Sequence, residues 1–151
     1  MRSPEAPSSV GLPFEYVGFW LRAWASLIDT VLVLLLIVPL MLAYAGPGYF
    51  DDQRLVKGWF GLLVEWIIPA AVVLLFWIAR GATPGKLAIS AVIVDAGSGQ
   101  AASRRQLVVR YLGYYLSTLP LGLGLLWVAF DARKQGWHDK LAGTVVIRPR
   151  R

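Results

Sequence analysis

The stretch GFWLRAWASLIDTVLVLLLIVPLMLAYA, residues 18–45, decides the fold of this chain. No charged residue follows Asp29 within it, and an apolar segment of this length can cross a lipid bilayer. We therefore predict a transmembrane helix over about residues 21–44. Arg22 and Asp29 near its start need an explanation, because charged side chains inside transmembrane segments are rare and usually face a partner or a functional site.

A second apolar segment predicts a second transmembrane helix over about residues 59–79. It lies between Lys57 and Arg80, and Glu65 is its only charged residue. The whole chain is 57% hydrophobic and only 16% charged, whereas soluble domains have about 25% charged residues. Tryptophan and tyrosine residues flank both segments, as is typical at membrane interfaces. We expect a multi-pass α-helical integral membrane protein.

A third apolar region, residues 107–130, contains Arg110 and Pro120. The most basic parts of the chain lie on either side of this region, so a single crossing would place them on opposite sides of the membrane. Because positive residues favour the cytoplasmic side, we favour a re-entrant or interfacial helical hairpin over about residues 104–130. A single crossing is the open alternative. The hairpin would place both termini in the cytoplasm.

Local signals set the limits of this hairpin and predict a small sheet beside it. Ser103 followed by Gln106 is the signature of a capping box and predicts a helix start, and residues 118–120 predict the break. Two short β-branched runs, residues 89–94 and 144–148, flank the hairpin. A lone strand is unstable in water, so we expect these runs to pair as a two-stranded cytoplasmic β element.

Composition limits the possible partners. We expect residues 1–15 to be disordered, residues 16–148 to form a single membrane domain and residues 149–151 to form a basic tail. The net charge of +6 suits anionic lipid headgroups better than nucleic acid. The chain has no cysteine and a single histidine, which excludes disulfides, cysteine-ligated metals and sites that need two histidines. We expect no metal and no cofactor.

Four features of the sequence keep the order and spacing of a known family: GFWLRAWASLID (18–29), RGATPGKLAISAVIVDAGSGQ (80–100), Arg110 and GWHDKLAGTVVI (136–147). Together they resemble the RDD family of small bacterial membrane proteins, which is named for one arginine and two aspartates. The resemblance implies that Arg22 is the family arginine and Asp29 the first aspartate. It implies Asp139 as the second aspartate, with Asp131 as the alternative. It also implies a bacterial inner-membrane location, and ion exchange has been proposed for members of the family.

The segment GATPGK, residues 81–86, differs from a phosphate-binding loop because the Walker pattern needs four residues before its Gly-Lys pair. We interpret Gly81 as a left-handed helix cap and Lys86 as a lipid contact. A turn follows Gly81, formed by Thr83, Pro84 and Gly85. Where the family usually has glycine, five residues after the glycine of the Gly-Lys pair, this chain has Ser90, so we expect close backbone packing to be lost there.

The last motif contains His138 and Asp139, which are adjacent and so do not share a helix face. We interpret the pair as a lock on a helix or turn rather than as an acid–base pair. Gly143 and Thr144 form a compact turn into the final strand. The chain contains no recognisable catalytic triad or pair of catalytic carboxylates, and we expect no enzymatic activity.

The charged residues near the membrane are expected to form one network. Arg22 alone would be explained by a side chain that reaches back to the interface, but the shorter Asp29 needs a partner. The two lie seven residues apart on one helix face, about 10 Å apart along the axis. We therefore expect this face to meet other charged side chains, with Lys86, Arg110 and Asp139 available.

Two functions remain open. The first is exchange of monovalent cations and protons through Asp29 in a homo-oligomer, with Glu65 as a secondary candidate nearer the opposite interface. The second is a non-catalytic accessory or scaffold subunit of a larger membrane assembly, which binds a protein partner or anionic lipid. We favour exchange, because a buried aspartate is costly in a membrane and leucine would be more stable there.

Overall fold

The computed structural model describes residues 13–55 and 57–150. Two helical runs are long and apolar enough to cross a membrane, α1 (Phe19–Ala45) and the run Gly58–Arg80. The second run consists of α2 (Gly58–Gly61), the π-helical η2 (Leu62–Ile67) and α3 (Ile68–Arg80), and the short helix η1 (Pro47–Asp51) lies in the connection. Both predicted segments are therefore helices long and apolar enough to span a membrane, each slightly longer than expected.

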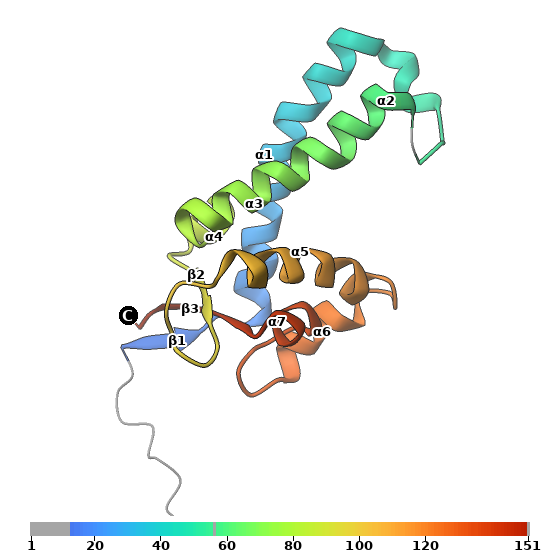
Figure 1. Ribbon diagram of the computed structural model, residues 1–151. Coiled ribbons are helices and arrows are strands. Elements are labelled where there is room, and N and C mark those ends of the chain that lie inside the picture. The colour runs from blue at the N-terminus through green and yellow to red at the C-terminus, as the bar shows by residue number, and fades with distance from the viewer. Residues whose placement is uncertain (1–12, 56, 151) are drawn as a thin grey trace, which may run out of the picture.

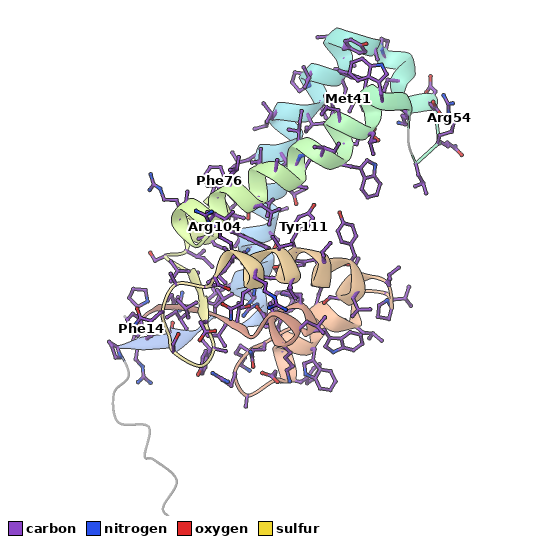
Figure 2. All side chains as sticks on the ribbon, in the orientation of Figure 1. Phe14, Met41, Arg54, Phe76, Arg104 and Tyr111 are labelled. Carbon is purple, nitrogen blue, oxygen red and sulfur yellow. The ribbon has the colours of Figure 1, made fainter. Side chains whose placement is uncertain are left out.

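Large apolar side chains project outward along both runs (Figure 2). Trp20 is 76% exposed, Leu35 68% and Leu75 64%. Soluble monomers rarely expose apolar patches of more than a few hundred Å², whereas lipid contact favours such a surface. This surface and the length of the two runs are those of a helical membrane protein.

The region after the spans folds as two shorter helices, α5 (Arg104–Thr118) and α6 (Leu123–Phe130), which meet at an angle of 102°. The capping box of Ser103 and Gln106 begins α5, as predicted. Leu121 and Gly122 have φ values of 55° and 77° at the break, and a helix cannot continue through such left-handed residues. Residues 107–130 are therefore not one straight helix.

Three strands form an antiparallel sheet in the order β1–β3–β2: β1 (Phe14–Tyr16), β3 (Thr144–Pro149) and β2 (Val92–Asp95). The expected two-stranded element is wrong in its number of strands, because residues 14–16 add an edge to β3. Phe14 and Glu15 were expected to be disordered, and Pro149 was assigned to the tail. Residues 1–12 and 151 lie outside the described residues.

The sheet, α5, α6 and two short helices gather at the end of the spans marked by Phe19 and Arg80, while residues 46–55 of the connection lie at the other end (Figure 1). We call these the terminal end and the loop end. The short helices are α4 (Pro84–Ala88) and α7 (Trp137–Ala142). At the terminal end a buried apolar core joins both spans to the sheet and α5, and it consists of Val17, Trp77, Ala91, Ile93, Leu107 and Val146.

Ser90 lies in the turn between α4 and β2 with φ of 58°, and its side chain is exposed. The expectation that Ser90 disturbs close backbone packing is therefore wrong. What the position requires is a left-handed backbone, which glycine adopts without strain and other residues adopt at a cost.

Candidate functional site

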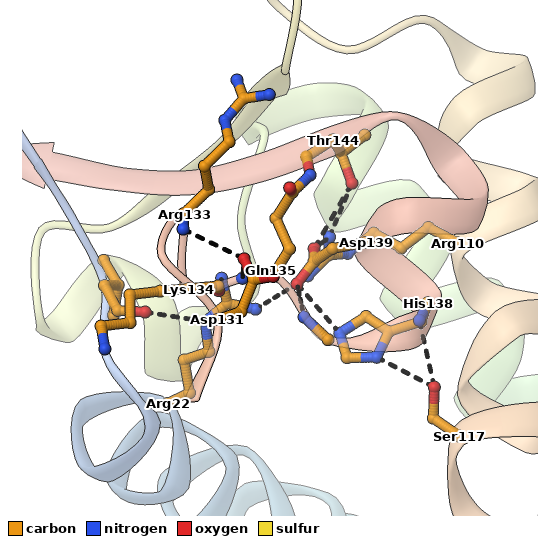
Figure 3. Close-up of polar contacts among 12 residues, drawn as sticks. Arg22, Arg110, Ser117, Asp131, Arg133, Lys134, Gln135, His138, Asp139 and Thr144 are labelled. Carbon is orange, nitrogen blue, oxygen red and sulfur yellow. Dashed lines mark hydrogen bonds and ion pairs between the residues drawn. The ribbon is translucent and has the colours of Figure 1, made fainter. Parts of the chain in front are cut away.

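One carboxylate joins the first span to the rest of the terminal end. Arg22 Nη1 in α1 donates to Asp139 Oδ2 in α7 at 2.5 Å, and Arg110 Nη1 in α5 pairs with Asp139 Oδ1 (Figure 3). The side chains of Arg110 and Asp139 are completely buried, and that of Arg22 is 11% exposed. Three elements that are distant in the sequence are therefore tied together at Asp139.

The remaining hydrogen-bonding groups of this cluster are largely satisfied. Arg22 donates to the carbonyl oxygens of Val17 at 3.0 Å and Lys134 at 2.6 Å. The Thr144 hydroxyl accepts from Arg110 at 2.8 Å and lies 3.4 Å from Asp139 Oδ1. The interpretation of Arg22 as a side chain that reaches back to the interface is therefore wrong, because its guanidinium faces inward and is paired.

His138 lies beside this cluster and is also buried. Its Nδ1 lies 3.3 Å from Ser117 Oγ, its backbone N–H donates to the same oxygen at 3.1 Å, and its ring stacks on Tyr114 with centroids 3.9 Å apart. Burial lowers the pKa of His138, and the charges of Arg110 and Arg22 lower it further. These effects favour the neutral ring, whose Nε2 lies 3.4 Å from Asp139 Oδ2, and the ring packs α7 against α5.

Asp29 belongs to a second cluster, at the turn that follows the second span. The Thr83 hydroxyl donates to Asp29 Oδ2 at 2.5 Å, and the Gly85 backbone N–H donates to Oδ1 at 2.7 Å. Thr83 precedes α4, and Pro84 is the first residue of that helix. Asp29 thus accepts the free donors at the start of α4, a position where a negative charge is favourable.

The close approach of α4 to α1 at this point requires glycine at position 85. A Cβ at Gly85 would lie 2.8 Å from the Ala25 carbonyl carbon and 2.9 Å from Asp29 Cγ. The backbone of α4 therefore rests directly on α1, and the glycine of the Gly-Lys pair is what permits it.

Lys86 is the least satisfied charged group of the second cluster. The residue is 5% exposed, and within the described part of the chain its one hydrogen bond is long, 3.5 Å from Nζ to Thr83 Oγ1. Its ammonium also lies 5.9 Å from the centroid of the Trp77 ring. Burial lowers the pKa of Lys86. Asp29, Thr83 and Lys86 form a chain of polar contacts in which Thr83 is the middle member.

A cavity of about 810 Å³ adjoins this chain. Aromatic and apolar side chains of α3 and α5 form one part of its wall, and the 79% exposed Leu119 lies at its edge. Polar side chains of α1, of the turn after α3 and of α4 form the other part, and they are Ser26, Asp29, Thr30, Thr83 and Lys86. Pockets of this size accommodate ions with their water or small molecules.

The sequence predicted one charge network, and the structure has two. Arg22, Arg110 and Asp139 form the first, and Asp29 and Lys86 belong to the second. Asp29 faces the turn that leads to Lys86, one of the three charged residues expected near it. Among the described residues it makes no hydrogen bond to an arginine.

The other predicted residues lie apart from both clusters or terminate helices. Asp131 pairs with Lys140 at 2.5 Å, and this contact lowers the pKa of Asp131. Glu65 lies 3.7 Å from Lys57 in a different cavity. Gly81 and Gly143 both have φ of 65° and end α3 and α7 as left-handed caps.

Sequence reasoning missed Tyr114 and Ser117, which contact His138. Arg110, Tyr114 and Ser117 are spaced four and three residues apart, so they share one face of α5. A polar stripe beside a buried arginine was therefore the available signal.

Comparison with known proteins identifies relatives of this sequence. A protein of Rickettsia prowazekii (strain Madrid E), described as "Uncharacterized protein RP437", is 38% identical over 73 residues, which are 48% of this chain and 40% of the relative. The chain thus aligns with less than half of the length of that relative. No solved structure matches the chain significantly. The sequence model of the RDD family matches residues 16–143, a range that contains both charge clusters, and the chain is therefore a member of the RDD family.

Proposed function

We propose that this protein exchanges protons for monovalent cations across the bacterial inner membrane, at the cavity beside Asp29, Thr83 and Lys86. The observation that carries the proposal is the buried Lys86 ammonium, linked through the Thr83 hydroxyl to the Asp29 carboxylate. Ionisable residues at membrane depth commonly mark ion and proton pathways.

In the proposed exchange, one positive charge at a time lies beside Asp29, and either the Lys86 ammonium or a bound cation supplies it. With Lys86 protonated, its ammonium supplies that charge. Burial lowers the pKa of Lys86, which favours release of its proton. In the proposed exchange Asp29 then faces the cavity without the ammonium beside it. Hard cations prefer oxygen ligands, which the carboxylate and the hydroxyls of Ser26 and Thr30 offer. Protonation of Lys86 and cation binding would therefore exclude each other.

The cluster of Arg22, Arg110 and Asp139 has a structural role in this proposal. Its carboxylate is completely buried, is neutralised by two guanidiniums and also accepts from the Gly136 backbone N–H, and it does not line the cavity as Asp29 does. It would fix α5 and α7 to the first span and so keep the cavity wall in place. We further propose that both termini are cytoplasmic, as the positive-inside tendency favours, and that a homo-oligomer encloses the path.

The test is proton movement in lipid vesicles that contain the purified protein and a trapped pH-sensitive dye. Pulses of sodium or potassium should move protons with the wild type and with Asp131→Asn, a matched control at a residue that does not line the cavity. Asp29→Asn keeps an acceptor oxygen but loses the charge, and it should abolish the cation-dependent signal. Activity of Asp29→Asn equal to that of the wild type would remove Asp29 from the mechanism.

Lys86 gives a sharper test, because arginine keeps its proton in proteins. Lys86→Arg should therefore leave a permanent cation beside Asp29 and block exchange. Lys86→Met should still bind cations but lose the coupling to protons. In this variant a radioactive cation should still cross the vesicle membrane, whereas no cation-dependent proton movement should be seen. Coupled exchange in Lys86→Met would contradict the proposed role of the ammonium.

A non-catalytic accessory subunit is the second candidate, and one observation favours it. Both oxygens of Asp29 already accept hydrogen bonds, from Thr83 and Gly85, as a purely structural cap would. Such a subunit should co-purify from native membranes with a stable protein partner. Recovery of the protein alone, together with cation-dependent proton movement, would rule this candidate out.

A further inference from the structure

A second cavity, of about 450 Å³, lies nearer the loop end of the second span. Lys57 and Glu65 line it, and Lys57 Nζ lies 3.7 Å from Glu65 Oε1. Glu65 is part of the π-helical η2, and π-helical turns occur frequently at functional sites. Asp52 and Arg54, which pair with each other at 2.8 Å, also line this cavity. Both cavities therefore contain a lysine near a carboxylate.

One face of the second span lines both cavities. Pro69 borders the cavity of Glu65, and Val73 and Trp77 border the cavity of Asp29. These three residues are four apart in sequence, so they lie on successive turns of the same face. From Glu65 to Trp77 the helix rises about 18 Å, which is more than half the thickness of a hydrocarbon core of about 30 Å.

Two tyrosines are common to the walls of both cavities. Tyr111 and Tyr115, one turn apart on α5, are the only side chains that line the two cavities together among the described residues. Their hydroxyl oxygens are 3.3 Å apart, and their rings meet edge to face with centroids 5.7 Å apart. The two cavities are thus neighbours that share a hydrogen-bonded pair of phenols at the protein surface, where Tyr115 is 46% exposed.

We propose that the Lys57–Glu65 pair is a second monovalent-cation site, and that Tyr111 and Tyr115 close a single path between it and the cavity of Asp29. This inference rests on the proposed exchange function. A hydrogen bond between two neutral phenols has a small net strength, so rotation of either ring can join the cavities. A phenol oxygen can also accept from water or contact a passing cation, which suits a closure on an ion path.

The chain has no native cysteine, so a single Ser26→Cys reports access to the cavity of Asp29 without interference. Sealed vesicles of one orientation are treated with a membrane-impermeant methanethiosulfonate that carries a trimethylammonium group. Ser26→Cys should react from the terminal side and react little from the loop side. With Tyr111→Ala and Tyr115→Ala together, the loop-side rate should rise at least about tenfold, the scale on which access and local cation concentration change rates.

Three controls keep the test decisive. Tyr44→Ala removes an exposed aromatic ring outside both cavities and should leave the loop-side rate unchanged. Tyr115→Ala alone should give a smaller rise in the loop-side rate. This single variant can be used for the test if the double variant does not fold. Glu65→Gln in the open background should slow the cationic reagent but leave a neutral reagent of similar size unaffected, because only the cation is attracted by the carboxylate.

The inference is overturned if Ser26→Cys reacts equally fast from the loop side with both tyrosines present, or if their removal leaves that rate unchanged. Failure of the exchange function is a separate outcome, because thiol labelling measures access and needs no transport. Labelling as expected without cation-dependent proton movement would retain the path and reject exchange. Proton movement without the change in labelling would retain exchange and reject the closure at the tyrosines.

Discussion

Arg22 in the first span donates a 2.5 Å hydrogen bond to Asp139, which lies 117 residues further along the chain in α7. Arg110 pairs with the other oxygen of the same carboxylate. One negative charge is thus shared by two guanidiniums in a buried site, and each partner of this cluster comes from a different helix. The stability of the terminal end should therefore depend strongly on Asp139.

We expect Asp139→Asn to destabilise the protein by about 3–5 kcal/mol, because removal of one partner of a buried ion pair leaves an uncompensated buried charge. In Asp139→Asn the buried guanidiniums of Arg22 and Arg110 would both lose their negative partner. The measurement is the free energy of unfolding in detergent micelles, from denaturant titration followed by circular dichroism. The same variant should release α7 from α1, visible as faster amide hydrogen exchange in residues 137–142.

Asp131→Asn is the matched control. Asp131 pairs with Lys140, the two side chains being 12% and 45% exposed, and pairs that water reaches contribute about 1 kcal/mol or less. Its Oδ2 also accepts from the backbone N–H groups of Arg133 and Gln135, and the amide oxygen of asparagine can keep these bonds. Equal losses of stability in Asp131→Asn and Asp139→Asn would contradict the assignment of the buried cluster as the main tie between the spans and α7.

The spans and the break between α5 and α6 could be predicted because their signals are local. A long apolar segment predicts a span wherever it packs, and Pro120 close to Gly122 predicts a helix break, although the isolated Pro39 lies within α1. The capping box at Ser103 is also a contact between near neighbours. The third strand was missed because Phe14–Tyr16 becomes a strand only through pairing with β3.

The charge clusters could be predicted only in part, because their contacts join distant residues. Arg22, Asp29 and Asp139 are charged residues in a membrane protein, which indicated buried polar sites. Their spacing along the sequence does not show which of them contact one another. Thr83 was interpreted only as a turn residue, although its hydroxyl donates to Asp29. Hydroxyl groups are too common in turns for sequence alone to single out this one.

Gly85→Ala should destabilise the protein by about 1–3 kcal/mol, the usual cost of forcing an extra methyl group into a closely packed site. The added Cβ would meet the backbone of Ala25 and the carboxylate of Asp29, so α4 would have to move away from α1. The free energy of unfolding measures this effect. Gly48→Ala is the control, since a Cβ there meets nothing within 4 Å, and a similar loss in both variants would contradict the close contact.

Ser90→Gly should stabilise the protein by about 1 kcal/mol, because Ser90 has φ of 58° and a left-handed conformation costs non-glycine residues about 1–2 kcal/mol. The side chain is exposed, so its removal loses little packing. Thermal unfolding in detergent should show a higher Tm for Ser90→Gly and no increase for Ser90→Ala. Stabilisation by both substitutions would point to the hydroxyl rather than the backbone.

The single histidine predicts how stability depends on pH. Burial lowers the pKa of His138 in the folded protein, whereas an unfolded histidine has a pKa of about 6.5. Below this pH the unfolded state therefore binds one proton more than the folded state, and stability falls as pH falls. Between pH 7 and pH 5.5 the loss should be about 1.2 kcal/mol, measured by denaturant titration at each pH.

His138→Asn tests this origin of the pH dependence. Asparagine can place its amide near Ser117 Oγ, where His138 Nδ1 lies at 3.3 Å, but it has no proton to gain in this range. The variant should lose part of its stability at pH 7 and show a nearly flat dependence down to pH 5.5. A slope equal to that of the wild type would assign the dependence to another group and would mean that His138 accepts a proton in the folded protein.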